Sequence, residues 1–411
     1  MIVLWSHCQL IVVFDCHTML PRKSTVVRYF LFATIFVIAF VWLVSDGYLK
    51  RNDFAEAQKD IDVWLTANES ELLREFNKLR LEYGEDGPFS YQQASKNLSL
   101  SELRQEVLRM QQNRPKNPHP FRYVINPTSV CSSDIFLLVY VHSAPAHFKK
   151  RMSIRETWGN GRNFQDVVIK VIFLCGIIPT DEGHSVQDAL LLEADTYGDI
   201  VQEDFVDSYR NLTYKGILGL KWVSSHCSHA QFLLKSDDDI FINIFSLVRH
   251  LQQLSLLRKK PVRDLLLCLV WYRMKVMRDP RSKWYLSPTE FAGDIFPTYC
   301  SGSAFIMTPD VASAMFNASF RVQFFWVDDF YVTGLLAREV GVTHDNFNSV
   351  YMLSPSAFLQ KFTEPNVSLT LVVGHVHKIN YMKIVWNHVL AEQHRQKMNV
   401  AENATTPYSN S

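Results

Sequence analysis

Three consecutive aspartates, Asp237, Asp238 and Asp239, stand between two apolar runs, residues 231–234 and 240–242. Adjacent carboxylates repel one another, so a fold that gathers them needs a cation to offset their charge. Divalent ions such as Mg²⁺ and Mn²⁺ prefer carboxylate and phosphate oxygens. A solvated acidic turn is the alternative, but apolar residues on both sides argue against an exposed turn. The triplet therefore predicts a metal site at the end of a short buried strand.

A second acidic pair, Asp328 and Asp329, also lies inside apolar sequence, after residues 324–326. A buried carboxylate whose pKa is adjusted by its surroundings can act as a general base. The competing explanation is an aspartate that caps a helix predicted over residues 334–340. The residues by themselves leave both explanations open.

Two arginines, Arg151 and Arg155, are spaced four residues apart and precede Trp158. This spacing puts both guanidinium groups on one face of a helix. Guanidinium groups beside an aromatic ring suit the recognition of a phosphate and a base. An ordinary arginine pair on a helix surface is the alternative.

Two histidines, His375 and His377, follow the apolar residues 371–373 and Gly374. A histidine after an apolar run is more often structural than a ligand. Beside an aspartate triplet, however, an imidazole is a candidate metal ligand.

The elements that must position these side chains alternate along the chain. Continuous apolar runs predict buried strands, over residues 135–141, 167–174, 231–234, 265–271 and 304–307. Helical patterns fall between them, over residues 185–194, 213–224 and 245–256. This alternation predicts an α/β fold with a mostly parallel central sheet. In such sheets ligands bind beyond the carboxyl ends of the strands, where the aspartate triplet falls.

Two of the seven cysteines, Cys131 and Cys227, each lie four residues before a predicted strand. If those strands are parallel neighbours, both cysteines lie at the same sheet edge and a disulfide is geometrically reasonable. The alternative is two ordinary buried thiols. Five cysteines follow the apolar segment described next, so at least one thiol is left without a partner within this part of the chain.

An apolar segment near the N-terminus, residues 26–45, approaches the length that spans a bilayer as a helix. No small-residue cleavage site follows it, which predicts an uncleaved signal-anchor. Asn-x-Ser/Thr sequons all lie after this segment and favour a lumenal body, at Asn68, Asn97, Asn211, Asn317, Asn366 and Asn403.

The 411 residues thus divide into five predicted parts. These are a cytosolic tail (1–25), a transmembrane segment (26–45), a lumenal stem (46–120) with amphipathic helices over 69–76 and 100–110, a globular catalytic domain (121–395) and a polar C-terminal tail (396–411). The formal net charge of +1 argues against a general nucleic-acid-binding protein.

Several further motifs stand in a fixed order with those above. They are Arg151…Arg155-Glu-Thr-Trp-Gly, Glu193…Tyr197-Gly-Asp-Ile-Val, Asp204 to Lys215, Lys235-Ser-Asp-Asp-Asp, Lys283-Trp-Tyr, Pro297 to Gly302 and Asp328-Asp-Phe-Tyr. In their joint order and spacing, residues 117–386 resemble the inverting β1,3-galactosyltransferases, including the related β1,3-N-acetylglucosaminyltransferases.

The resemblance implies a GT-A fold, a UDP-sugar donor, a glycan acceptor, Mn²⁺ as cofactor and a single-pass type II protein of the Golgi membrane. It makes Asp329 the base, although this chain has Asp328-Asp329-Phe330 where the family commonly has Glu-Asp-Val. It implies metal ligands at Asp239, Asp237 and His375, with His377 as the alternative histidine. Nucleotide-sugar binding falls to Arg151, Arg155, Lys235, Asp237 and Asp238.

The mechanism expected from this resemblance is a single displacement at the anomeric carbon of a UDP-α-sugar. Asp329 takes the proton of the acceptor's 3-hydroxyl, and inversion gives a β1,3 linkage. UDP-galactose is the expected donor, with UDP-N-acetylglucosamine as the alternative. A catalytically inactive lumenal glycan-binding protein and a glycoside hydrolase are the other classes, although a hydrolase leaves the Lys-x-Asp-Asp-Asp pattern without a purpose.

Overall fold

The computed structural model describes residues 2–6, 9–13, 63, 66–83, 98–112, 114–164, 166–178, 183–258, 261–364, 370–376 and 378–405. The predicted transmembrane segment, residues 26–45, and His377 lie outside these ranges. Of the helices in the described ranges, none is both long enough and apolar enough to cross a membrane. The chain divides into two compact units, one of residues 1–73 with 100–108 and one of residues 74–99 with 109–411.

The first unit contains a short hairpin, in which β1 (Ile2–Ser6) pairs antiparallel with β2 (Gln9–Val13) inside the predicted cytosolic tail. The predicted helices of the stem are confirmed as α2 (Glu69–Tyr83) and α3 (Leu100–Gln112), which both extend from one unit into the other. Helix α2 begins with a reciprocal capping box. The Asn68 side chain accepts from the Glu71 backbone N–H, and the Glu71 carboxylate accepts from that of Asn68, both at 3.0 Å.

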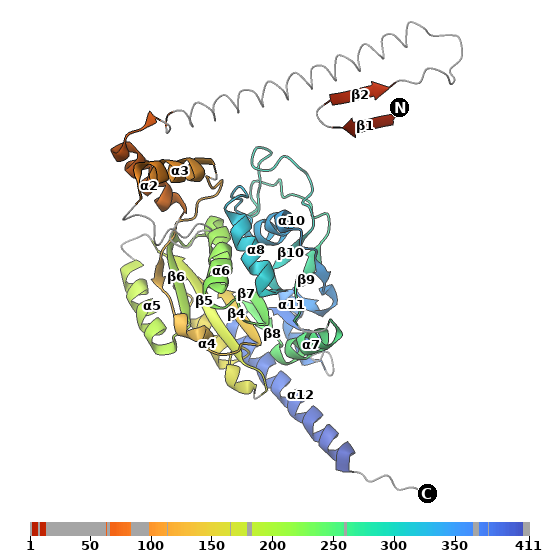
Figure 1. The fold of residues 1–411 in the computed structure, drawn as a ribbon. Coiled ribbons are helices and arrows are strands. Elements are labelled where there is room, and N and C mark those ends of the chain that lie inside the picture. The colour runs from red at the N-terminus through yellow and green to blue at the C-terminus, as the bar shows by residue number, and fades with distance from the viewer. Residues whose placement is uncertain are drawn as a thin grey trace, which may run out of the picture. The chain divides into compact units, whose positions relative to one another are not determined.

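A mixed sheet forms the centre of the second unit (Figure 1). Its strand order within the described residues is β11-β9-β10-β7-β4-β5-β6-β3. The bounds are β3 Tyr123–Ile125, β4 Leu137–His142, β5 Ile169–Ile177, β6 Ile200–Val206, β7 Phe232–Asp237, β9 Leu266–Trp271, β10 Tyr299–Met307 and β11 Asp345–Asn346. A smaller sheet has the order β12-β13-β8, with β12 Tyr351–Met352, β13 Val373–His375 and β8 Ile240–Ile242.

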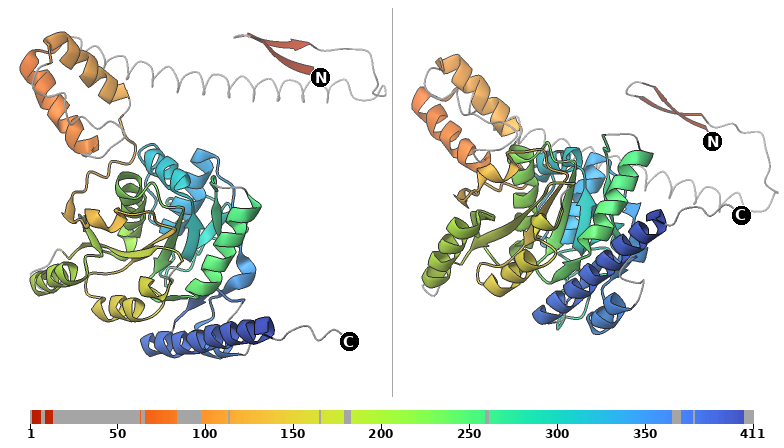
Figure 2. Two further views of the ribbon diagram at one scale, coloured as in Figure 1. Left: turned by 60° about the horizontal axis from the view of Figure 1, so that its bottom comes forward. Right: turned by 90° about the horizontal axis from the view of Figure 1, so that it is seen from below.

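Helices cover both faces of the large sheet (Figures 1 and 2). Their bounds are α4 Phe148–Glu156, α5 Gly183–Tyr197, α6 Leu212–His226, α7 Ile244–Leu257, α8 Pro309–Ser319, α9 Asp328–Phe330, α10 Ala337–Val340, α11 Pro355–Thr363 and α12 Ile379–Thr405. A π-helical segment (Tyr331–Leu336) joins α9 to α10, in the region predicted as an ordinary helix. Helix α12 continues into the predicted polar tail.

Strand β4 shows why the two layers of helices form. Its residues alternate between the two faces, so that Leu137, Val139 and Val141 pack into one core with α4, α7 and α12. Leu138 and Tyr140 pack into the other core with α6 and α8. Because both faces of the strand are buried, its sequence is a continuous apolar run rather than an alternating one.

The predicted parallel sheet is confirmed for β7, β4, β5 and β6, which pair in parallel. The prediction was wrong for β10, which runs antiparallel to both of its neighbours, β7 and β9. An apolar run indicates that a strand is buried on both faces but does not specify its direction, and β10 is mostly buried although it runs antiparallel to β7 and β9.

The predicted disulfide between Cys131 and Cys227 is present, with their Cα atoms 5.5 Å apart. The two following strands, β4 and β7, are parallel neighbours in register at Leu137 and Phe232, as the argument required. A second disulfide joins Cys268 of β9 to Cys300 of β10. Cys175, which is buried in β5, is the described cysteine left unpaired.

Candidate active site

The aspartate triplet lies where β7 ends. Asp237 is the last residue of the strand, and Asp238 and Asp239 form the turn that leads into β8. Strand β13 then pairs with β8, so that His375 lies opposite Ile240, and the Val376 backbone N–H donates to the Asp239 carbonyl at 2.8 Å. Asp238, Asp239, His375 and Lys150 thereby line one pocket of about 220 Å³. The small sheet thus brings the predicted histidine to the predicted aspartates.

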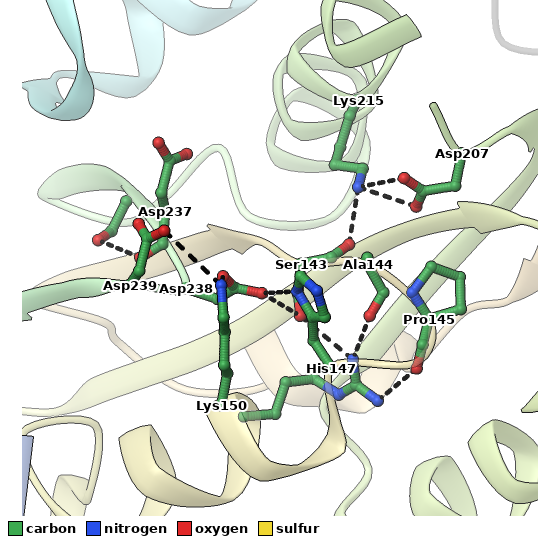
Figure 3. Close-up of polar contacts among 12 residues, drawn as sticks. Ser143, Ala144, Pro145, His147, Lys150, Asp207, Lys215, Asp237, Asp238 and Asp239 are labelled. Carbon is green, nitrogen blue, oxygen red and sulfur yellow. Dashed lines mark hydrogen bonds and ion pairs between the residues drawn. The ribbon is translucent and has the colours of Figure 1, made fainter. Parts of the chain in front are cut away.

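Asp238 is the buried member of the triplet (Figure 3). Its carboxylate accepts from the Ser143 hydroxyl at 2.9 Å and from the Lys150 ammonium at 2.7 Å, and it lies 2.7 Å from His147 Nδ1. Burial opposes ionisation, but the hydrogen bonds from His147 and Lys150 outweigh it and hold the pKa of Asp238 below its ordinary value. Asp238 is therefore charged and already satisfied by side chains of its own fold.

Asp237 is paired with Lys235, two residues earlier on the same strand, at 2.6 Å. The Lys235 ammonium also donates to the Gly302 carbonyl of β10. Burial raises the pKa of Asp237 to about 7; Lys235 opposes this shift and the negative charge of Asp328 adds to it. The Asp237 side chain is still 40% exposed, so contact with water moderates the shift.

Asp329 lies on α9 and contacts the same Gly302. One carboxylate oxygen accepts from the Gly302 backbone N–H at 3.2 Å and the other from the Phe330 backbone N–H at 2.8 Å. Burial, with a further contribution from Asp328, raises the pKa of Asp329 to about 7. A side chain at position 302 would place its Cβ 3.0 Å from the Asp329 Cβ, so this close approach depends on glycine. The carboxylate is therefore held in one place and titrates near neutral pH, as a general base should.

Two aromatic side chains, Tyr209 and Trp284, lie near this acidic pair. Burial and the negative charge of Asp328 raise the pKa of Tyr209, while a hydrogen bond with Trp284 opposes the shift. Trp284 is 53% exposed, and the Lys283 ammonium lies 4.6 Å from its ring centroid. This surface combines apolar faces with polar groups, which suits a sugar ring.

Arg151 is fully buried and contacts the loop that follows β4. Its guanidinium donates to both Glu193 oxygens, at 2.9 and 2.6 Å, and to the carbonyls of Ala144 and Pro145, at 2.7 and 2.8 Å. Lys215, also buried, donates to the Ser143 carbonyl of this loop at 2.7 Å. Two buried cations therefore hold three consecutive carbonyls of the loop 143–145 in place.

Arg155 continues the same network. It donates to Glu193 at 2.6 Å and to both oxygens of Asp199 at 2.8 Å, between the rings of Phe173 and Tyr197. These partners are all within the chain, so the geometry of both arginines is that of side chains that position a loop. Direct contact of Arg151 or Arg155 with a nucleotide stays a prediction.

The residues around Asp239 fit a divalent metal in part. The Asp239 side chain is 41% exposed, and it shares its pocket with the imidazole of His375. A carboxylate and an imidazole are ligands that Mn²⁺ accepts. Within the described residues, no group of three His, Cys, Asp or Glu side chains is close enough to hold a metal ion. The chemistry fits an ion that takes its remaining ligands from a bound diphosphate and water, as is common for small hard cations.

Sequence reasoning missed the side chains that hold the triplet in place. His147 and Lys150 contact Asp238, and Asp207 forms an ion pair with Lys215 at 2.8 Å. Lys150 directly precedes Arg151 near the start of α4, the helix that follows the predicted strand 135–141. That strand belongs to the same sheet as β7, which ends at the triplet. That position was the available signal, since adjacent parallel strands end at the same sheet edge.

Comparisons with known proteins identify relatives of this chain. A family model described as "Galactosyltransferase" matches residues 149–348. The β-1,3-galactosyltransferase 1 of Mus musculus is 34% identical over 257 residues, which cover 62% of this chain and 74% of that protein. The lactosylceramide 1,3-N-acetyl-beta-D-glucosaminyltransferase of Rattus norvegicus is 36% identical over 229 residues, which cover 54% and 59%.

Among solved structures, the galactosyltransferase LgtC in complex with donor and acceptor sugar analogues covers 61% of this chain and 95% of its own, at 10% identity and a TM-score of 0.33. That likeness is too weak to add to the assignment, and the GT-A fold stays a prediction. The relatives identified from sequence are sufficient: the chain is a glycosyltransferase and belongs to the galactosyltransferase family.

Proposed function

We propose that this glycosyltransferase moves galactose from UDP-α-galactose to the 3-hydroxyl of a glycan acceptor and forms a β1,3 linkage. The observation that carries the proposal is the Asp329 carboxylate. It is held by the N–H groups of Gly302 and Phe330 and has a pKa raised to about 7. The carbonyl of the same Gly302 accepts from Lys235, the partner of Asp237 at the end of β7. An inverting transferase needs one such base, and a carboxylate that titrates near neutral pH can take a proton from a hydroxyl as it attacks.

In the proposed reaction the acceptor's 3-oxygen attacks the anomeric carbon from the side opposite the diphosphate. The bond from the anomeric carbon to the phosphate oxygen breaks, and UDP leaves with the bonding electrons. The hydroxyl proton passes to Asp329. Gly302 and Phe330 keep the carboxylate oriented toward the acceptor, while Tyr209 and Trp284 offer the surface on which the acceptor sugar lies.

Asp239 and His375 would hold the divalent metal. The third ligand expected from the sequence, Asp237, is not grouped with them in this structure and is paired with Lys235. When bound, Mn²⁺ would supply positive charge for the departing diphosphate. In this proposal the protein is a single-pass type II protein of the Golgi membrane, anchored by residues 26–45, with its catalytic domain in the lumen. Its acceptor is a glycan on a glycoprotein or glycolipid.

Transfer of N-acetylglucosamine is the second candidate. One relative that matches this chain is named as a lactosylceramide 1,3-N-acetyl-beta-D-glucosaminyltransferase, at 36% identity. The two donors differ at C2 and in the orientation of the 4-hydroxyl. A site that hydrogen-bonds one of these groups rejects the other donor strongly, whereas an apolar pocket discriminates weakly.

The experiment is transfer from each donor to a panel of galactose- and N-acetylglucosamine-ended acceptors, with release of UDP and linkage of the product measured. We expect UDP-galactose to be preferred, a β1,3-linked product, and loss of activity in EDTA that added MnCl₂ restores. Preference for UDP-N-acetylglucosamine would change the proposed donor and leave the rest of the proposed function in place. Full activity in EDTA would exclude a metal requirement. UDP release without a transfer product would point to a different activity.

The raised pKa of Asp329 makes a prediction about pH. Because the base must be ionised to accept a proton, kcat/KM should be low at acid pH, rise about tenfold per pH unit, and level off above the pKa of Asp329 at about 7. UDP affinity, measured across the same range, is the control for Asp237, whose pKa is also raised to about 7. A rate that is constant from pH 5 to 8 would show that no group with this pKa acts in the reaction.

A further inference from the structure

Among the basic side chains of this site, Lys150 differs from the others in its surroundings. Arg151, Lys215 and Lys235 are at most 2% exposed, and the contacts given above show them bound to carboxylates and carbonyls of the chain. Arg155 is 11% exposed and is held by Glu193 and Asp199. The Lys150 side chain is 32% exposed and lines the pocket of Asp239 and His375. It is the one of these five cations that a ligand in this pocket can reach.

The charge around Lys150 identifies the kind of ligand. Its ammonium lies 2.7 Å from an Asp238 oxygen and 3.6 Å from an Asp239 oxygen (Figure 3). A diphosphate that enters this pocket meets these carboxylates and needs positive charge to offset the repulsion. An ammonium has three N–H donors, and Lys150 uses one on Asp238 at short distance, so it can donate to a phosphate oxygen without leaving Asp238.

We propose that Lys150 binds the diphosphate of the nucleotide-sugar donor, so that Asp238 acts as the support of Lys150 rather than as a metal ligand. This inference rests on the proposed function, because it takes the pocket to be the donor's diphosphate site. Helix α4 has a role in this arrangement: Arg151 anchors it beneath the loop 143–145, and the adjacent Lys150 is thereby held at the pocket.

The test compares Lys150→Met with Lys149→Met in the full-length protein, at one fixed MnCl₂ concentration and again in EDTA. Lys149 is the adjacent, exposed lysine and is the matched control. Binding of UDP and of uridine is measured for each variant. Because a hydrogen bond to a charged group is lost, UDP should bind roughly ten- to a hundredfold more weakly to Lys150→Met. Uridine binding should be unchanged, Lys149→Met should behave as wild type, and Lys150→Arg should recover part of the UDP affinity.

The outcomes separate cleanly. Equal UDP affinity in Lys150→Met and wild type would overturn the inference and leave the proposed function intact. An equal loss for UDP and uridine would also overturn it, since it would mean that Lys150 only maintains the shape of the pocket. Failure of the wild-type protein to bind UDP at all would remove the proposed function, and this inference with it.

Discussion

Replacement of Asp329 by asparagine should reduce kcat by a factor of roughly 10² to 10⁴. Asparagine keeps the size of the side chain, although its single amide oxygen can accept from only one of the Gly302 and Phe330 N–H groups. It cannot accept the proton of the acceptor's hydroxyl. Because Asp329 acts on the acceptor, UDP affinity should stay close to that of the wild type. Initial rates with saturating donor and acceptor, together with calorimetric titration of UDP, measure both quantities.

The matched control is Asp328→Asn, one residue away on the same short helix. Asp328 has no assigned role in proton transfer, so its loss should have a much smaller effect on kcat. An inactive Asp328→Asn beside an active Asp329→Asn would mean that the base is the first aspartate of the pair. Loss of UDP binding in Asp329→Asn would instead indicate that the substitution disturbs the donor site.

Replacement of Arg151 by methionine should destabilise the protein by about 3–5 kcal/mol, as is typical when one partner of a buried ion pair is removed. Glu193 would keep only Arg155, and the carbonyls of Ala144 and Pro145 would lose their buried donor. Because these carbonyls belong to the loop that also supplies Ser143 to Asp238, UDP affinity should fall as well. Urea unfolding gives the change in free energy, provided that unfolding is reversible and two-state.

Arg162→Met is the control, since Arg162 is exposed and surface substitutions usually change stability by about 0.5 kcal/mol or less. The experiment also decides between two roles for Arg151. A variant with wild-type stability but lost UDP binding would support the direct contact between Arg151 and the nucleotide that the sequence suggested. A variant with lost stability supports the role of a buried anchor.

The carboxylates of the candidate site could be picked out from the sequence because unusual residues in a short stretch are visible without knowledge of the fold. Asp237 to Asp239 and Asp328 to Asp329 interrupt apolar runs, and the carboxyl end of a strand was the correct location for the triplet. The Cys131–Cys227 disulfide could also be predicted, because the spacing from each cysteine to its strand is the same and parallel neighbours preserve that register.

The partners of these residues could not be predicted in the same way. Lys150 reaches Asp238 only because β4 and β7 are neighbours, and a sequence contains no statement of which strands pair. The Cys268–Cys300 disulfide joins antiparallel strands whose register shifts between Cys300 and Phe305, so no fixed spacing indicates it. The carboxylate partners of the arginines could not be predicted for a related reason. A guanidinium suits a phosphate and a buried carboxylate equally well, and only the position of Glu193 in space shows that both arginines bind a carboxylate here.

The pairing of β13 with β8 has a consequence for biosynthesis. His375 and the backbone contact to Asp239 come from a segment that the ribosome makes long after the aspartate triplet. The large sheet can assemble from earlier residues. The side of the pocket lined by His375, Val376, Ile379 and Met382 forms only after the end of the domain has been synthesised. A nascent or prematurely terminated chain can therefore contain the aspartate triplet and still lack a complete pocket, because the pocket needs the chain at least as far as Met382.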